Sequence, residues 1–174
     1  MGVNGIATDQ KMADQWRVTQ NFTQTTSTIT PITDNWARNT TNGFGQLGTG
    51  VTVTNGEFSF PSTGIFLITY TFQGRADTDP TTGPLRYFAV SMQVTTDDAD
   101  SWTLAVLSHE SIHTQPSDLP TGKAAYALVS GTFMFRVQDV ATDRFRMVIQ
   151  SSDEVEIIGS SARNDNDVTV VQLM

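Results

Sequence analysis

The chain has 174 residues, no cysteine and a formal net charge of −8 at pH 7. This length suits a single domain that buries its core without disulfides or a structural metal, and the missing cysteines exclude thiol catalysis and thiolate metal sites. The negative charge disfavours nucleic acid and anionic membranes as partners. The longest apolar run, residues 124–129, is too short for a membrane-spanning helix.

Residues 1–29 differ in character from the rest of the chain. Polar residues there surround isolated aromatic residues, among them Trp16 and Phe22, and sustained alternation is absent. Such a segment buries too little apolar surface to fold alone. We therefore predict an N-terminal arm over residues 1–29 that orders on a partner, and one folded domain over residues 30–174. The competing interpretation makes residues 15–24 an edge strand of that domain.

The remaining residues indicate an all-β chain, because threonine is abundant, strong helix formers are scarce and turn residues recur at short intervals. Asn55-Gly56 separates two short alternating segments and predicts a hairpin. In the clearest strand Phe66, Ile68 and Tyr70 share one face, which we predict to lie in the core. About eight to ten strands are expected, which favours a sandwich or barrel. The longer predicted strands cover residues 64–76, 85–96, 102–108, 124–139, 144–150 and 168–174.

The sharpest chemical motif is His109-Glu110-Ser111-Ile112-His113, which matches the H-E-x-x-H pattern of zinc proteases. That pattern requires a helix, on which the two histidines are neighbours. Here it follows a predicted strand, on which His109 and His113 would lie about 13 Å apart. No third ligand occurs at a familiar spacing. We therefore predict that these histidines bind no metal.

Other sequence features make no stronger case for catalysis or a cofactor. The Asp-rich segments 77–83 and 164–167 offer oxygen ligands for calcium, but the EF-hand pattern is incomplete and solvated turns are the default interpretation. The glycine-rich segment 43–50 lacks the Lys-Ser/Thr of a phosphate-binding loop. No G-x-S-x-G elbow occurs, and a carboxylate pair of the glycosidase kind leaves no mark in a sequence. We expect a non-enzymatic protein without a cofactor.

Three aromatic residues of the N-terminal part, Trp16, Phe22 and Trp36, have two interpretations. They either cap one end of the sandwich or pack against neighbouring subunits, where large aromatic side chains are enriched. Both interpretations stay open at this point, and the three residues are candidate interface residues.

Residues Gly56 to Phe66 spell G-x-F-x-x-P-x-x-G-x-aromatic. This pattern resembles the signature of C1q/tumour-necrosis-factor-like (TNF-like) jelly rolls, at the hairpin that enters their long central strand. Thr142-Asp143-Arg144-Phe145 resembles their Gly-Asp-x-hydrophobic turn, with Thr in place of Gly. The apolar strand 168–174 falls where those proteins end, although Val170-Val171-Gln172 replaces their Phe-x-Gly. The resemblance covers residues 30–174 and implies a jelly-roll β-sandwich and a homotrimer.

Segments 13–17, 35–36 and 44–50 also resemble small virion proteins of marine tailed phages that carry this jelly roll. This implies a homotrimer displayed on the outer surface of a virus particle. We expect a capsid decoration or cement protein bound to the major capsid protein or another virion protein, because the short arm leaves no room for a fibre shaft. The alternative is the receptor-binding tip of a head or tail fibre that recognises host surface glycans. A secreted C1q-like lectin or ligand is a third option, disfavoured because no secretory signal follows Met1.

Overall fold

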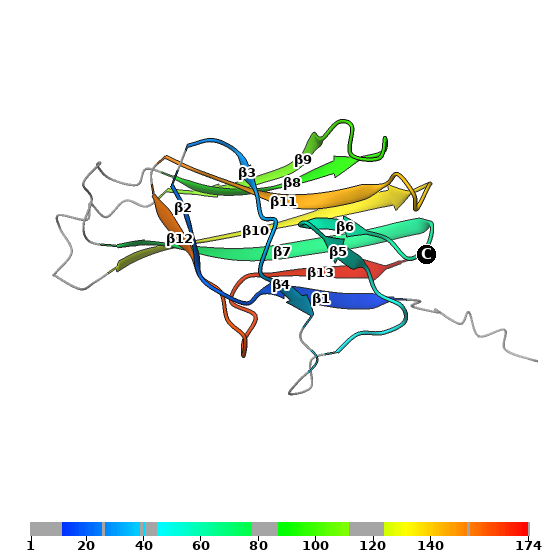
Figure 1. Cartoon of the computed structure of the whole chain (residues 1–174), viewed down its shortest axis with the longest axis horizontal. Helices are drawn as coiled ribbons and strands as arrows, with labels where there is room; N and C mark the ends of the chain where they lie inside the picture. The colour runs from blue at the N-terminus through cyan, green and yellow to red at the C-terminus, as the bar shows by residue number, and fades with distance from the viewer. Residues whose placement is uncertain are drawn as a thin grey trace, which may run out of the picture.

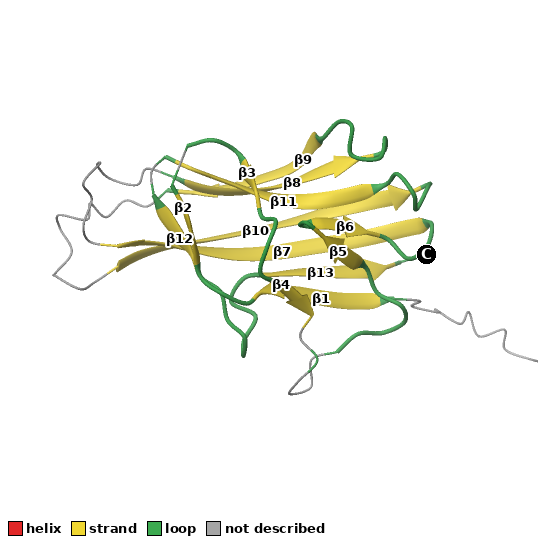
Figure 2. Cartoon of the chain, in the orientation of Figure 1, coloured by secondary structure: helices red, strands yellow, loops and turns green. Residues whose placement is uncertain are grey.

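The computed structural model describes residues 12–25, 27–38, 40, 45–77, 87–111, 124–152 and 154–173. In these ranges the chain forms 13 strands and no helix (Figure 2). The strands make two antiparallel sheets that face each other as a sandwich (Figure 1). The predicted all-β jelly-roll architecture is confirmed. The strand count exceeds the expectation because several strands are only two or three residues long.

Sheet A is organised around one long strand, β7, whose two edges are paired differently. One edge pairs with β10 over the full length of both strands. The other edge pairs with β13 and, further along, with β12. Beyond β13 lie β1 and β4, and beyond β12 lies β2. The bounds are β1 Ala13–Val18, β2 Phe22–Gln24, β4 Trp36–Arg38, β7 Gly64–Asp77, β10 Ala124–Val137, β12 Val155–Ile157 and β13 Asp167–Gln172.

Sheet B has the order β5-β6-β11-β8-β9, and the short strand β3 pairs with β11 beside β6. The chain therefore alternates between the two sheets, as a jelly roll requires. β9 is the last strand of this sheet, and its pairing with β8 shifts register between Met92 and Gln93. The bounds are β3 Thr30–Pro31, β5 Thr52–Thr54, β6 Glu57–Ser59, β8 Phe88–Thr95, β9 Thr103–Glu110 and β11 Arg144–Ser151.

The core lies between the sheets and is filled by alternate residues of facing strands. In β7, Phe66, Ile68 and Tyr70 are at most 2% exposed, which confirms the predicted inward face. The aromatic ring of Phe58 on β6 stacks on that of Phe145 on β11, with 4.4 Å between the ring centroids. Because side chains alternate across a strand, the residues between these positions point away from the core.

The predicted hairpin at Asn55-Gly56 is present and joins β5 to β6. Both residues have positive φ, 51° and 78°, as the tight turns of two-residue hairpins require. A Cβ atom on Gly56 would lie 2.1 Å from the carbonyl oxygen of Ile32. Glycine is therefore required here both by the backbone conformation and by the close approach of the segment that precedes β4.

The N-terminal boundary of the domain differs from the predicted one. Residues 13–18 form β1, which lies inside sheet A between β13 and β4. Met12 and Val18 are 1% and 0% exposed. The alternation was masked because one inward residue of β1 is the charged Asp14, which is buried with partners inside the same chain. The jelly roll therefore includes β1 and β2, contrary to the predicted arm; residues 1–11 and 26 lie outside the described residues.

Candidate functional site

The two sheets meet along one side of the sandwich, where β9 of sheet B runs beside β10 of sheet A. The hydroxyl of Ser108 donates to the carbonyl oxygen of Ser130 at 2.6 Å and so joins the two strands. The hydroxyl of Tyr70 lies 3.0 Å from Ser108 Oγ and 3.1 Å from the carbonyl oxygen of Val90. Burial raises the pKa of Tyr70, and the hydrogen bond with Ser108 partly opposes the shift. The Tyr70 side chain is therefore neutral, and its hydroxyl links β7 of sheet A to β8 and β9 of sheet B.

Both strands on this side expose large apolar side chains. Tyr126, Leu128 and Met134 of β10 are 55%, 59% and 62% exposed. Leu104 and Leu107 of β9 are exposed by about half. Within the described part of the chain, the ladder of β9 pairs only with β8 and that of β10 only with β7. Strand edges with exposed apolar residues are the parts of a sheet that another chain covers most readily.

The apolar surface continues from β10 across the outward side of sheet A. The strand register places Val171, Leu67 and Met134 in one row across β13, β7 and β10. The next row consists of three threonines, and Tyr126 and Leu128 follow further along β10. We call these outward residues the sheet A face. Its members are Leu67, Thr69, Tyr126, Leu128, Thr132, Met134, Thr169 and Val171.

The sheet A face is poor in carboxylates, although the whole chain carries a net charge of −8. Among the described outward side chains of β7, β10 and β13, Asp167 is the only carboxylate. Burial raises the pKa of Asp167, and hydrogen bonds from Gln15 and Thr169 partly oppose this. Two acidic copies of the chain can therefore meet on this face without bringing opposing carboxylates together.

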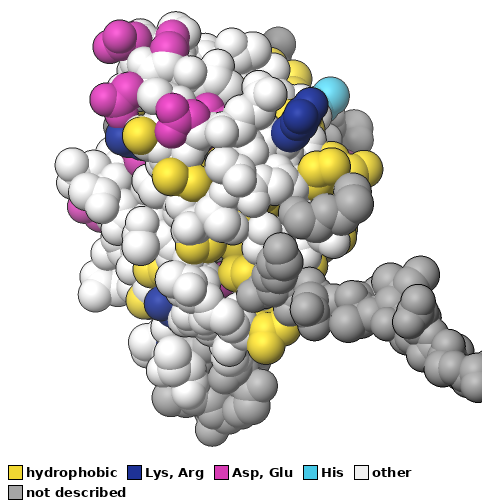
Figure 3. All heavy atoms as spheres, turned by 90° about the vertical axis from the view of Figure 1, so that its right-hand side faces the viewer, with side chains coloured by type: hydrophobic (Ala, Val, Ile, Leu, Met, Phe, Trp, Pro, Cys, Tyr) yellow, Lys and Arg dark blue, Asp and Glu magenta, His cyan; other side chains and the backbone are white. Residues whose placement is uncertain are grey.

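Acidic side chains gather instead at one corner of an end of the sandwich (Figure 3). Among the acidic side chains, Glu57 and Asp98 both accept from Arg144 of β11, at 3.1 and 2.5 Å. Hydrogen bonds from Ser101 and, to a smaller extent, Thr95 lower the pKa of Asp97. Among the residues that the structure describes, no group of three or more His, Asp or Glu side chains is placed to hold a metal ion.

The candidate interface residues lie on the opposite side of the molecule from β10. The ring of Trp16 packs edge-on against Phe58 at 6.2 Å, and Trp36 packs against Phe58 at 5.1 Å and Phe72 at 6.2 Å. Both tryptophans are thus attached to the core, as the end-cap interpretation expects. Phe22 is half-buried and lines a pocket. Contact of any of the three with another subunit stays a prediction.

The H-E-x-x-H motif begins on a strand, as predicted. His109 and Glu110 are the last two residues of β9, and both side chains are exposed. His113 lies outside the described residues. The helical geometry on which a zinc protease depends is therefore absent at His109 and Glu110. Across the described ranges, no helix is long and apolar enough to span a bilayer.

Two of the segments considered for ligand binding have structural roles where the structure describes them. A Cβ atom on Gly50 would lie 2.5 Å from Asp14 Oδ2, so this glycine lets the loop approach a buried carboxylate. Asn166 is fully buried. Its side-chain oxygen accepts from the backbone N–H of Gln73, and its side-chain nitrogen donates to the backbone carbonyl oxygen of Gln73 at 3.1 Å. The expectation of a solvated turn is therefore wrong for Asn166. Residues 43, 44 and 78–83 lie outside the described ranges.

Solved structures of other proteins share this arrangement of strands. Murine APRIL superposes with a TM-score of 0.59 at 13% sequence identity, covering 93% of this chain and 98% of its own. The Eiger TNF of S. frugiperda superposes with a TM-score of 0.62 at 12% identity, covering 93% of this chain and 92% of its own. The fold is a TNF-like jelly roll. No protein-family model matches the sequence, and no curated protein matches it.

The sheet A face of this TNF-like jelly roll was not among the candidate sites taken from the sequence. Its residues occupy the outward positions of strands that the alternation predicted correctly. The signal was present in Tyr126, Leu128 and Met134, because a strand whose two faces are both apolar is typical of a strand covered on both sides. The sequence does not tell whether the second cover comes from the same chain or from another.

Proposed function

We propose that this protein is a homotrimer and serves as a non-enzymatic decoration protein on the outer surface of a phage capsid. The observation that carries the proposal is the sheet A face, which is apolar, poor in carboxylates and adjacent to β9 and β10, each of which pairs with one strand only among the described residues. Interfaces between identical subunits are more apolar than ordinary surfaces. A second copy of the chain is therefore the occupant that fits this face.

The geometry of the contact also favours a closed ring. In this proposal the β9–β10 side of one copy packs on the sheet A face of the next, so the contact joins two different surfaces. Contacts of this kind build rings when the rotation closes. The resemblance of residues 56–66 to trimeric TNF-like jelly rolls supports three copies in that ring.

One feature supports attachment to a particle. The carbonyl oxygen of Met12 accepts from the backbone N–H of Gln172 at 2.9 Å, so β1 begins where β13 ends, at one end of the sandwich (Figure 1). A segment that precedes Met12 starts from that end. In the proposal, residues 1–11 bind the major capsid protein or another virion protein, and the opposite end faces outward.

Purified virions test this function. A decoration protein is present in far more copies per particle than a fibre tip, and quantitative mass spectrometry measures the copy number directly. The purified protein should also bind particles that lack it, and removal of residues 1–11 should abolish that binding while the mass of the assembly stays the same. A copy number in the range of the tail fibres would reject decoration.

The alternative function is the receptor-binding tip of a head or tail fibre that recognises host surface glycans. One observation favours it, namely the pocket beside Phe22, whose lining mixes apolar and hydrogen-bonding side chains. A copy number as low as that of the fibres, together with loss of host adsorption when the protein is removed, would support this alternative.

A further inference from the structure

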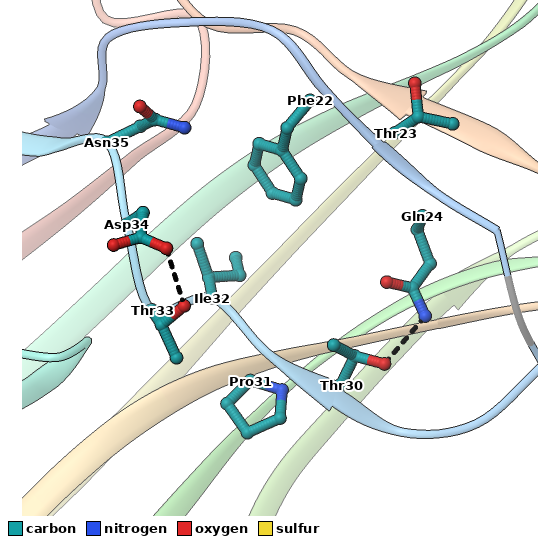
Figure 4. A pocket seen from close by; sticks show the side chains of 9 residues that line it. All are labelled: Phe22, Thr23, Gln24, Thr30, Pro31, Ile32, Thr33, Asp34 and Asn35. Carbon is teal, nitrogen blue, oxygen red and sulfur yellow. Dashed lines mark hydrogen bonds between the residues drawn. The ribbon is translucent and has the colours of Figure 1, made fainter.

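A pocket of about 220 Å³ lies on the side of the sandwich away from β9 and β10. It is enclosed by the segment from Phe22 to Asn35, which passes from one sheet to the other (Figure 4). β2 in this segment pairs with β12 of sheet A, and β3 pairs with β11 of sheet B. The pocket thus lies where one continuous stretch of chain bridges the two sheets.

Hydrogen bonds within the chain hold the walls of the pocket in place without a ligand. The backbone N–H of Ile32 donates to the carbonyl oxygen of Met147 at 2.9 Å, and the carbonyl oxygen of Ile32 accepts from Trp36 Nε1 at 2.9 Å. On the opposite wall, Gln24 Nε2 donates to Thr30 Oγ1 at 2.8 Å. A pre-formed pocket loses little conformational entropy when it binds a ligand.

The lining combines an aromatic ring with unused hydrogen-bonding groups. Phe22 and Ile32 turn apolar surface toward the space between the two walls, and Asp34 and Asn35 stand together beside it (Figure 4). Thr33 Oγ1 donates to Asp34 Oδ2 at 3.0 Å, which leaves Asp34 Oδ1 available. The side-chain amide of Asn35 forms no hydrogen bond with a described residue, and its backbone is held at a φ of 64°.

These groups define the chemistry of a ligand. A carboxylate accepts hydrogen bonds from hydroxyl groups, and a primary amide both donates and accepts. The aromatic and aliphatic wall suits the C–H face of a ring. Asp34 disfavours an anionic ligand, and it is the single carboxylate among the lining residues, whereas calcium and magnesium sites in proteins are built mainly around carboxylates.

We propose that this pocket binds a single neutral sugar ring, a pyranose, with its C–H face on Phe22 and its hydroxyl groups on Asp34 and Asn35. The volume is below the range of about 300–1,000 Å³ that is typical of sites for drug-sized ligands, which fits one ring. Thr33 and Asp34 are exposed, so the remainder of a glycan would extend into solvent beside them. The proposal does not depend on the trimer or on the virion role.

The test is a titration of the full-length protein with simple glycosides. Binding is monitored through the backbone amide chemical shifts in NMR spectra. The ligands are the methyl glycosides of glucose, galactose, mannose and N-acetylglucosamine at millimolar concentrations, with methyl glucuronide as the anionic comparison. At least one neutral glycoside should shift the amide signals of Phe22, Ile32 and Asn35, and the glucuronide should bind more weakly. The titration tests sugar binding alone. Sedimentation measures the oligomeric state separately, so the two proposals can fail independently.

Three variants decide whether the shifts report this pocket. Asn35→Gly removes the amide and keeps a residue that accepts positive φ, and Asp34→Ala removes the carboxylate. Each should weaken binding about tenfold, the loss expected for hydrogen bonds to a charged or well-oriented group. The matched control is Asn55→Gly in the β5–β6 turn, which replaces a second asparagine of positive φ among the described residues. It should leave the affinity unchanged.

Two results would overturn the proposal. One is the absence of any shift at the pocket with all four neutral glycosides. The other is binding that survives both Asn35→Gly and Asp34→Ala with unchanged affinity, because the sugar would then sit elsewhere. Loss of sugar binding in these variants with an unchanged sedimentation coefficient would support it.

Discussion

Asp14 and Arg38 form a bidentate ion pair that ties β1 to β4, with Nε–Oδ1 and Nη2–Oδ2 distances of 2.6 and 2.8 Å. The Asp14 side chain is 0% exposed and also accepts hydrogen bonds from the backbone N–H of Val51 and from Trp16 Nε1. The hydrogen bond to Asp14 is the main reason why the pKa of Arg38 is raised, against the effect of burial. The arginine therefore stays charged throughout the usable pH range.

Replacement of Asp14 by alanine should strongly destabilise the fold. Asp14→Ala leaves the Arg38 guanidinium and two N–H donors without their acceptor, and breaking a buried ion pair costs about 3–5 kcal/mol. Chemical denaturation measures the free energy of unfolding. The control is Asp165→Ala, which removes the partner of Arg163, a residue with a 75% exposed side chain; that change should cost less than about 1 kcal/mol. Equal losses in the two variants would contradict this role of Asp14.

Two truncations locate the start of the folded domain. A chain that begins at Met12 keeps β1 and should give an unchanged circular dichroism spectrum and melting temperature. A chain that begins at Thr28 loses β1 and β2, so β13 loses one of its two partner strands and Val18 leaves the core. We expect the shorter chain to unfold or aggregate. A stable, folded chain beginning at Thr28 would restore the arm that the sequence predicted for residues 1–29.

Gly131 makes room for a buried aromatic ring. It lies opposite Tyr70 in the β7–β10 pair, and a Cβ atom at Gly131 would lie 2.5 Å from Tyr70 Cζ and from its hydroxyl oxygen. Because Tyr70 is 2% exposed, it has no free space into which to move. Gly131→Ala should therefore lower the free energy of unfolding by about 1–3 kcal/mol. Gly45→Ala, whose Cβ would meet nothing within 4 Å, is the control and should be close to neutral.

The pKa of Asp97 should depend on Ser101. Hydrogen bonds from Ser101, then from Thr95, hold the pKa of Asp97 below its usual value of 3.8. A carboxyl group with a lowered folded-state pKa stabilises the fold above its unfolded-state pKa, and this contribution disappears as the pH falls through the folded-state pKa. Ser101→Ala should raise the pKa of Asp97 toward 3.8 in a carboxyl NMR titration and should remove the part of the contribution that the Ser101 hydroxyl supplies, while Thr95 still donates to Asp97. An unchanged titration curve would show that Ser101 is not responsible.

Much of the fold could be predicted because alternation is a local property of the chain. The inward face of β7 and the β5–β6 hairpin depend on residues adjacent in sequence, and both are confirmed. β1 was missed because its inward positions include Asp14. The pattern alone marks Asp14 as polar and exposed, whereas its partners Arg38 and Val51 approach it only in the folded chain.

The candidate sites were harder to predict for a related reason. The motif at His109 matches a zinc-binding pattern by residue spacing alone. That spacing brings two histidines together only on a helix, and His109 and Glu110 lie on a strand. The sheet A face is assembled from strands that are distant in sequence, and the pocket beside Phe22 forms because one short segment pairs with both sheets. Sequence alone showed the residues of both features without placing them together.

The mass of the protein in solution tests the central claim most directly. Sedimentation equilibrium of the wild-type chain should give three times 19.0 kDa. Met134→Glu and Leu128→Glu, which place a charge on the sheet A face, should give the monomer mass, because an unpaired charge buried in an interface is strongly unfavourable. Val140→Glu changes a 42% exposed apolar residue in the β10–β11 turn and should remain trimeric. A monomeric wild-type protein at micromolar concentration, or a trimer that tolerates both charges on the face, would contradict the account.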